Sequence, residues 1–359
     1  MKPEATFYLS TYTESLPHVK TTGPGIICCS LNYDTGALKY KSEPVHARNP
    51  SYLWLNRTRS RLYAIAEVLD HEGKKDGCLQ VYDVNDNTIK LQQVVSSSGI
   101  GPAYCRGDDS GKNLLSVNYL AGSVYCYPIQ DDGLLGSYSS CDTLSGNGPN
   151  KTRQDAPHPH CIVTNSKNNR AYVADLGTDQ LISYQFDAAS GKLSRDESVS
   201  YRFKPNSGPR HAWFHPNGKH CFVTLELSSE LAVLRIEANR APEMVAISST
   251  TQQDTEENHP SEHVVTRDGS SIYVANRGRD SVGVFNFDPS NETLRQIGET
   301  ACGGATPRHL ALCPEERFLI VANQDGNTVN CLRRDLQNGD IQLTEHQLKI
   351  NAPCFIAFR

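Results

Sequence analysis

"APHPHCIVTNSKNNRAYVADLGTDQLISYQFDAASGKL", residues 156–193, contains three short runs rich in β-branched and aromatic residues, separated by polar segments. Runs of this length and composition predict β-strands. The first run opens at Pro159, the second ends on the acid Asp175, and the third leads into "DAASGKL". A turn rich in Asp, Ser and Gly favours a tight reversal into a fourth strand. The stretch therefore predicts one sheet of four antiparallel strands.

The same arrangement recurs along the whole chain. Each copy opens with a proline that begins a short apolar strand, and these prolines are Pro50, Pro102, Pro159, Pro209, Pro260, Pro307 and Pro353. Successive prolines lie 46 to 57 residues apart. A period of about 50 residues is typical of one four-stranded blade of a β-propeller.

The two ends of the chain complete the count of blades. Residues 352–359, "APCFIAFR", resemble a first strand with nothing after it, whereas residues 7–45 contain a second, third and fourth strand with no first. Pairing the chain ends closes the ring and removes exposed sheet edges. We therefore predict an all-β fold, a seven-bladed β-propeller that forms a single domain over residues 1–359, with the N- and C-terminal strands sharing one blade.

Composition narrows the class of protein. Lys and Arg number 35 against 40 Asp and Glu, a formal net charge of −5, and no basic block follows a phosphate backbone, so we expect no nucleic-acid partner. The twelve cysteines form no CxxC pair, which favours reduced thiols. The N-terminus resembles no secretory signal, and no apolar run approaches the roughly 20 residues that span a bilayer. We expect a cytoplasmic protein without membrane contact; its oligomeric state is left open.

A polar residue recurs 16 or 17 positions after each of the first six prolines, at Glu67, Asn118, Asp175, Glu226, Asn276 and Asn323. Equivalent ends of the inner strands of a propeller meet at one mouth of the central channel. We expect these side chains to gather there with Arg277 and with residues that open the first strands, namely His158, His160, Arg210, His211 and Arg308. The pattern predicts a polar pocket at the channel mouth.

Structural roles compete with functional ones for part of this set. Asn118, Asp175, Asn276 and Asn323 are adequately explained by hydrogen bonds to loops and by Asx turns. That explanation is weaker for the charged groups, because charges are rarely placed in a desolvated channel unless they are paired or used.

Other features of the sequence give weaker signals. His158 and His160, two residues apart on a strand, could share a metal, but a third ligand is not obvious, so we predict neither metal nor cofactor. Histidines such as His18 follow no pattern and are expected to be exposed. Residues 145–152, "SGNGPNKT", lack phosphate-loop spacing and predict a flexible connection over the channel mouth.

Four blades carry a resemblance to a known family: "PHPHCIVTNSKNNRAYVADLGTDQLISYQFD", "GPRHAWFHPNGKHCFVTLELSSELAVL", "HPSEHVVTRDGSSIYVANRGRDSVGVFNFD" and "TPRHLALCPEERFLIVANQDGNTV". They resemble the lactonase family of seven-bladed propellers, which includes cycloisomerase-type 6-phosphogluconolactonases and the fungal carboxymuconate lactonizing enzyme. Matched by motif, the resemblance implies four catalytic residues: His160, Arg210, Glu226 and Arg277. The remaining polar candidates are predicted to bind substrate: Glu67, Asn118, His158, Asp175, His211, Asn276, Arg308 and Asn323.

The activity implied is metal-independent hydrolysis of a small anionic sugar lactone, 6-phospho-D-glucono-1,5-lactone, to 6-phosphogluconate, a step of the pentose phosphate pathway. Opening a lactone with water requires a base and donors for the oxyanion. We assign Glu226 as the base, Arg210 and Arg277 as anion binders and His160 as the acid for the ring oxygen. Three alternatives stay open: a carboxymuconate cycloisomerase, a non-catalytic propeller that scaffolds protein partners, and a metal-dependent sugar lactonase.

Overall fold

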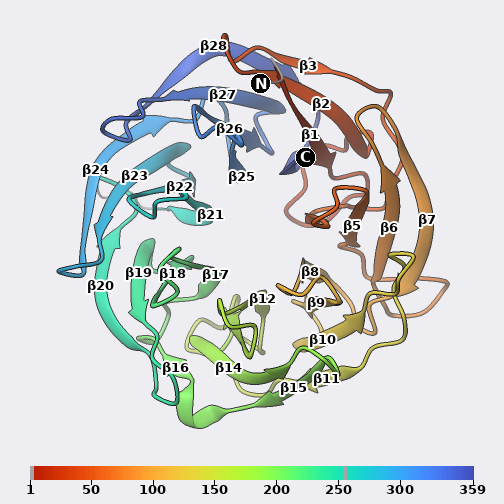
Figure 1. Ribbon diagram of the computed structural model, residues 1–359, viewed down its shortest axis with the longest axis vertical. Coiled ribbons are helices and arrows are strands. Elements are labelled where there is room, and N and C mark those ends of the chain that lie inside the picture. The colour runs from red at the N-terminus through yellow and green to blue at the C-terminus, as the bar shows by residue number, and fades with distance from the viewer. Residues whose placement is uncertain (1–3, 254–256) are drawn as a thin grey trace.

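Seven antiparallel sheets surround a central axis in the computed structural model of the protein, which describes residues 4–253 and 257–359 (Figure 1). Six sheets have four strands and one has a fifth. The helical structure of the described residues is a single 3₁₀ turn, Glu197–Val199. The predicted seven-bladed β-propeller is therefore confirmed.

Six blades are continuous in sequence, and the order of the strands in each sheet is their order along the chain. Their strands are β4 (Leu53–Leu55), β5 (Arg61–Ala66), β6 (Cys78–Val84) and β7 (Ile89–Ser96); β8 (Pro102–Gly107), β9 (Asn113–Asn118), β10 (Ser123–Pro128) and β11 (Ser140–Thr143); β12 (Pro159–Thr164), β13 (Arg170–Asp175), β14 (Gln180–Asp187) and β15 (Lys192–Arg195); β17 (Pro209–Phe214), β18 (His220–Leu225), β19 (Glu230–Arg235) and β20 (Glu243–Ser249); β21 (His259–Val265), β22 (Ser271–Arg277), β23 (Ser281–Asp288) and β24 (Thr293–Ala301); and β25 (Pro307–Leu312), β26 (Phe318–Asn323), β27 (Thr328–Arg334) and β28 (Ile341–Lys349). The short β16 (Tyr201–Arg202) pairs with β14.

The seventh blade joins the two ends of the chain, as predicted. Its order is β29 (Pro353–Phe358), β1 (Glu4–Thr11), β2 (Ile26–Asn32) and β3 (Leu38–Tyr40). The antiparallel register places Phe7 opposite Phe358. Figure 1 shows the N- and C-terminal ends in this one blade, so the first and last strands leave no unpaired inner edge.

The recurring prolines occupy a defined place in the sheets. Five of the seven begin the first strand of a blade; Pro260 is the second residue of β21, and Pro50 precedes β4. Proline lacks an N–H and is best tolerated at the start of a strand. Register shifts follow these prolines in β12, β17, β21 and β25, so a bulge re-aims the residues that come next.

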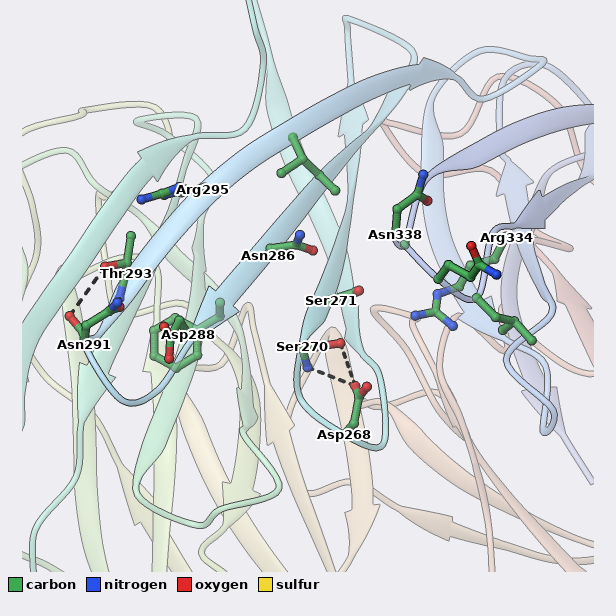
Figure 2. A pocket seen from close by; sticks show the side chains of 15 residues that line it. Asp268, Ser270, Ser271, Asn286, Asp288, Asn291, Thr293, Arg295, Arg334 and Asn338 are labelled. Carbon is green, nitrogen blue, oxygen red and sulfur yellow. Dashed lines mark hydrogen bonds between the residues drawn. The ribbon is translucent and has the colours of Figure 1, made fainter.

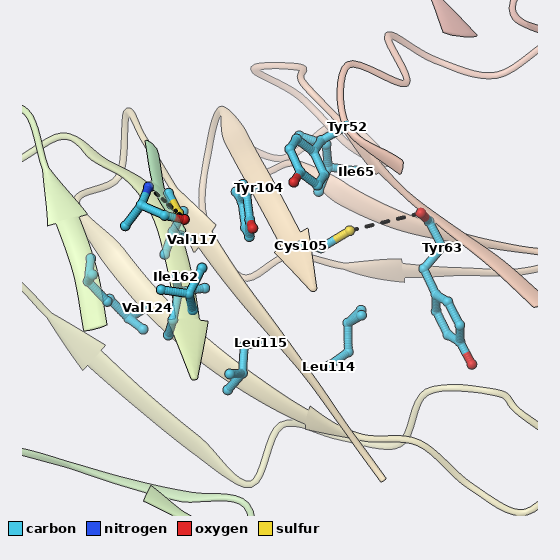
Figure 3. Close-up of a cluster of buried hydrophobic side chains, with 14 of the residues drawn as sticks. Tyr52, Tyr63, Ile65, Tyr104, Cys105, Leu114, Leu115, Val117, Val124 and Ile162 are labelled. Carbon is cyan, nitrogen blue, oxygen red and sulfur yellow. Dashed lines mark hydrogen bonds between the residues drawn. The ribbon is translucent and has the colours of Figure 1, made fainter. Parts of the chain in front are cut away.

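Neighbouring blades pack through their apolar faces. Figure 3 shows Tyr63, Cys105, Leu115, Val117 and Ile162 from three successive blades in one cluster, and each of them is almost fully buried. Burying this apolar surface supplies the main driving force for assembling the ring. Within the described residues, no helix has the length and apolar character needed to cross a membrane.

Candidate active site

A cavity of about 630 Å³ is lined by side chains from all seven blades. Eight of the twelve predicted site residues line it: Glu67, His158, His160, Arg210, His211, Glu226, Arg277 and Arg308. The other four, Asn118, Asp175, Asn276 and Asn323, do not. The structure thus brings together all four residues predicted to be catalytic.

The register of the inner hairpins explains which polar residues reach the cavity. Asn118 and Asn276 pair directly with the prolines of their blades, 16 residues upstream. In the blade that opens at Pro209, the proline pairs with Leu225, so Glu226 lies one residue further along. A step of one residue turns a side chain to the opposite face. The 17-residue spacing therefore marks the side chains that enter the cavity.

The four residues outside the cavity hold loops in place. Asn118 donates to the carbonyl oxygen of Ser97 at 2.9 Å, and Asn276 donates to that of Thr250 at 2.8 Å. Asn323 likewise donates to the Cys302 carbonyl oxygen, and Asp175 accepts from the His158 backbone N–H at 2.6 Å. Because their polar groups are engaged and buried, we do not carry these four residues into the site.

Glu226 is the centre of the charged part of the cavity. Its Oε2 lies 2.9 Å from Nε of Arg210 and 2.8 Å from Nη2 of Arg277, and its Oε1 lies 2.6 Å from Nη2 of Arg153. The Glu226 side chain is only 3% exposed. Three guanidinium groups from different parts of the chain are therefore fixed around one buried carboxylate, with geometry that favours charge-assisted hydrogen bonds.

These contacts decide the charge state of the glutamate. Burial alone would raise the pKa of Glu226, but Arg277, Arg153 and Arg210 together hold it well below its ordinary value. Burial and the neighbouring Arg277 lower the pKa of Arg210 to about 10, which still leaves it charged at neutral pH. Glu226 is consequently a permanent carboxylate and a weak base.

His160 lies beside this cluster with a different charge. Burial, reinforced by Arg210 and His211, lowers the pKa of His160 well below its ordinary value, so its imidazole is neutral. Its ring meets Tyr119 and His211 edge to face, with centroids 5.4 and 5.1 Å apart. Its buried Nδ1 has no hydrogen-bond partner among the described residues. A neutral imidazole beside a cationic cluster is equipped to accept a proton.

A second charged group lines another part of the cavity. Arg308 Nη2 lies 3.6 Å from Oε2 of Glu67, which also accepts a hydrogen bond from the Tyr12 hydroxyl at 2.8 Å. His18 Nε2 lies 3.4 Å from Oε1 of the same glutamate. The expectation that His18 is simply exposed was wrong: its side chain is 42% exposed but lines the cavity.

The loop before β12 supplies a residue that the sequence did not single out. Arg153 follows directly on residues 145–152, the segment predicted to be a flexible connection over the channel mouth. Asn150 Oδ1 accepts the Arg153 backbone N–H at 3.2 Å, and fully buried Gln154 donates to the Leu176 carbonyl oxygen at 2.9 Å. These hydrogen bonds tie the end of the loop to the blade and hold Arg153 at the cavity.

Tyr119 is the second residue that the sequence did not single out, although a signal for it exists. It lies 17 residues after Pro102, the same spacing as Glu226 after Pro209, and it lines the cavity. Its ring stacks on His158, with centroids 4.4 Å apart. The sequence pattern was followed through polar residues alone, and an aromatic residue in the same position was passed over.

His158 is held by acceptors at both ring nitrogens. Its Nδ1 donates to the Tyr119 carbonyl oxygen at 3.0 Å, and its Nε2 lies 3.0 Å from Oδ1 of Asp155. Neither nitrogen is free to share a metal with His160. Among the described residues, no group of three or more His, Cys, Asp or Glu side chains is placed to hold a metal ion.

Another cavity, of about 600 Å³, lies at the rim between the blades of β22–β24 and β27 (Figure 2). Its polar groups serve local turns: Asp268 accepts from the N–H and hydroxyl of Ser270, and Asn291 accepts from the Thr293 N–H. None of the predicted site residues lines it. The central cavity is therefore the candidate site.

Comparison with known proteins agrees with the fold and with the resemblance noted in the sequence. The family model described as "Lactonase, 7-bladed beta-propeller" matches residues 6–358. A 6-phosphogluconolactonase of Bacillus subtilis (strain 168) is 31% identical over 355 residues, which cover 98% of this chain and 97% of the relative. A 6-phosphogluconolactonase of Formosa agariphila is 28% identical, with 96% of each chain covered. The crystal structure of a Lactobacillus plantarum protein, 28% identical, superimposes with a TM-score of 0.89 over 99% of both chains.

Proposed function

Since the chain belongs to the family of seven-bladed β-propeller lactonases, we propose that it hydrolyses 6-phospho-D-glucono-1,5-lactone to 6-phosphogluconate. The relatives named 6-phosphogluconolactonase, which match over nearly the full length, support this substrate. The observation that carries the proposal is the meeting of neutral His160 with the guanidinium groups around Glu226 in one cavity. A cytoplasmic location and a place in the pentose phosphate pathway remain predictions that accompany it.

The charge of the cavity suits a phosphorylated substrate. Its lining includes four arginines, Arg153, Arg210, Arg277 and Arg308, against three carboxylates, Glu67, Asp155 and Glu226. This local excess of positive charge occurs in a chain whose formal net charge is −5. Guanidinium groups bind phosphate and carboxylate in a forked geometry, and a cleft of one sign concentrates oppositely charged ligands.

We assign the base to His160 in place of Glu226, the base expected from sequence. A carboxylate held by three guanidinium groups has little affinity for a proton, whereas the neutral imidazole of His160 has a free lone pair. In the proposed reaction, His160 accepts a proton as a water molecule attacks the lactone carbonyl carbon. Arg210 and Arg277 stabilise the oxyanion that forms on the carbonyl oxygen.

The second half of the reaction returns the proton. The tetrahedral intermediate collapses, the bond between the former carbonyl carbon and the ring oxygen breaks, and His160 gives its proton to that oxygen. The products are an open-chain hydroxy acid and the regenerated neutral imidazole. Glu226 stays a carboxylate throughout and keeps the guanidinium groups in place for the developing negative charge.

The test is a substrate panel with the purified protein, measured against spontaneous hydrolysis. We expect rapid hydrolysis of 6-phospho-D-glucono-1,5-lactone, slower hydrolysis of the unphosphorylated lactone, and no turnover of carboxymuconate. The exposed Arg240 provides a control, and Arg240→Ala should match the wild type. Preferential turnover of carboxymuconate would favour the cycloisomerase, and loss of activity on chelation would favour the metal-dependent lactonase. No turnover of any lactone would favour the scaffold.

A further inference from the structure

Glu262 is a buried carboxylate behind the cavity that the proposed reaction does not use. It lies in β21, its side chain is 8% exposed, and it does not line the cavity. Its Oε2 lies 2.9 Å from Nδ1 of His211 and 3.5 Å from Nε2 of His309, and its Oε1 accepts the His263 backbone N–H at 3.0 Å. A buried charge with this many donors is built for a purpose other than packing.

The contacts of His211 fix which of its nitrogens carries the proton. Nη1 of Arg210 lies 3.2 Å from Nε2 of His211, and a guanidinium group can only donate. Nε2 must therefore be the unprotonated acceptor. The proton of the neutral ring then resides on Nδ1, where it is donated to Glu262.

The contacts of His309 lead to the opposite tautomer. The backbone N–H of Ile356 donates to Nδ1 of His309 at 3.3 Å, so this nitrogen is unprotonated. The remaining proton is on Nε2, which faces Glu262. Glu262 thus faces one N–H from each of two neutral histidines, and both imidazoles have their acceptor nitrogens occupied.

This arrangement extends a line of hydrogen bonds into the site. Glu262 accepts from His211, His211 accepts from Arg210, and Arg210 lies against Glu226. Nη1 of Arg210 also donates to the Ser261 carbonyl oxygen at 2.7 Å, next to Glu262 in the sequence. The guanidinium group is therefore held from two sides, one inside the cavity and one behind it.

We infer that Glu262 is a positioning residue for the lactone hydrolysis proposed above, on which this role rests: it holds His211 in the Nδ1–H tautomer, and His211 aims Arg210 at the reacting carbonyl oxygen. Groups that orient a catalytic side chain in this way change rates by about 10- to 100-fold when they are removed. The negative charge of Glu262 also makes Nε2 of His211 a stronger acceptor.

The tautomers are tested without any substrate. Long-range proton–nitrogen correlation spectra of protein labelled with ¹⁵N-histidine distinguish the two neutral forms, and His211→Asn and His309→Asn samples assign the signals by their disappearance. We expect Nδ1–H for His211 and Nε2–H for His309. An Nε2–H signal from His211 would overturn the inference, whether or not the protein hydrolyses the lactone.

Two substitutions of His211 separate its two contacts. His211→Gln places an amide oxygen near the position of Nε2 and can still accept from Arg210, whereas His211→Asn retains a donor toward Glu262 but leaves Arg210 without its acceptor. We expect kcat to fall about 10- to 100-fold in His211→Asn, with KM changed less than about twofold, and to fall much less in His211→Gln. Equal losses in the two variants would overturn the role of Nε2.

Glu262→Gln tests the carboxylate itself. The amide keeps the shape but loses the charge, so we expect kcat to fall about 10-fold or more while the protein stays folded by thermal melting. His263→Asn is the matched control, because His263 is equally buried beside Glu262 but bonds Thr224 through its side chain. Wild-type kcat in Glu262→Gln would overturn the inference. An inactive wild type would instead reject the proposed hydrolysis and leave the tautomers as the deciding measurement.

Discussion

Glu226 and Arg277 meet as an ion pair, with Oε2 2.8 Å from Nη2, although they belong to neighbouring blades. The glutamate follows β18 and the arginine ends β22. Their contact joins two sheets at the cavity and also sets the charge available to a substrate. Stability and activity are thus linked in the same group of atoms, and substitutions there affect both.

Removing the acid should destabilise the fold more than removing one base. Glu226→Gln leaves three guanidinium groups without their counterion, and we expect the free energy of unfolding to fall by about 3 to 5 kcal/mol. Arg277→Gln leaves Glu226 paired with Arg153 and Arg210, so its cost should be smaller. Urea unfolding of both variants measures the difference, and the reverse order would contradict this account of the cluster.

The pH dependence of kcat/KM should identify the base. Burial, with Arg210 and His211, holds the pKa of His160 well below 6.5, and the active form is the deprotonated one. Activity should therefore be flat from neutral pH down to about 6.5 and decline only at lower pH. His160→Asn should lower kcat by about 100-fold or more. An acid limb centred above pH 7 would point to a different base.

Acid should destabilise the protein through buried neutral histidines. Burial lowers the pKa of His263 from 6.5 to about 4, so below pH 6.5 the unfolded chain binds a proton that the folded chain does not. Stability then falls as the pH drops from 6.5 to 4, by roughly 2 kcal/mol from this histidine at pH 5. His263→Asn should therefore lose less stability than the wild type between pH 7 and pH 5. Identical pH slopes in chemical unfolding would refute this prediction.

Arg153 should discriminate between phosphorylated and plain lactones. Its side chain is 36% exposed and reaches the cavity from the loop before β12, so it is the guanidinium group most able to turn toward a substrate phosphate. We expect Arg153→Ala to raise KM for the phosphorylated lactone about 10-fold and to change KM for the unphosphorylated lactone little. Parallel changes for both substrates would remove phosphate recognition from this residue.

The fold followed from the sequence because each blade repeats the same local signals. Proline, apolar runs and tight turns recur at a near-constant period, and the incomplete units at the two ends predicted the shared blade. The site was harder to predict. Asn118 and Glu226 stand in almost the same place after their prolines, yet one residue of register separates a loop anchor from a cavity wall.

Two kinds of residue escaped prediction for physical reasons. Arg153 lies in an irregular loop, where no period indicates the direction of a side chain. Glu262 acts through contacts with His211 and His309 from two other blades, and only the closed ring brings these together. The charge state of Glu226 also depended on spatial neighbours, because burial and three guanidinium groups act on its pKa in opposite directions.

The most direct measurement is the steady-state hydrolysis of 6-phospho-D-glucono-1,5-lactone by the wild type, Arg210→Ala and Arg277→Ala at one pH, with folding of each variant checked by thermal melting. We predict that the wild type accelerates hydrolysis far above the spontaneous rate and that each variant loses about 100-fold or more in kcat/KM. Folded variants that hydrolyse this lactone as fast as the wild type would show that the reaction does not take place at these guanidinium groups.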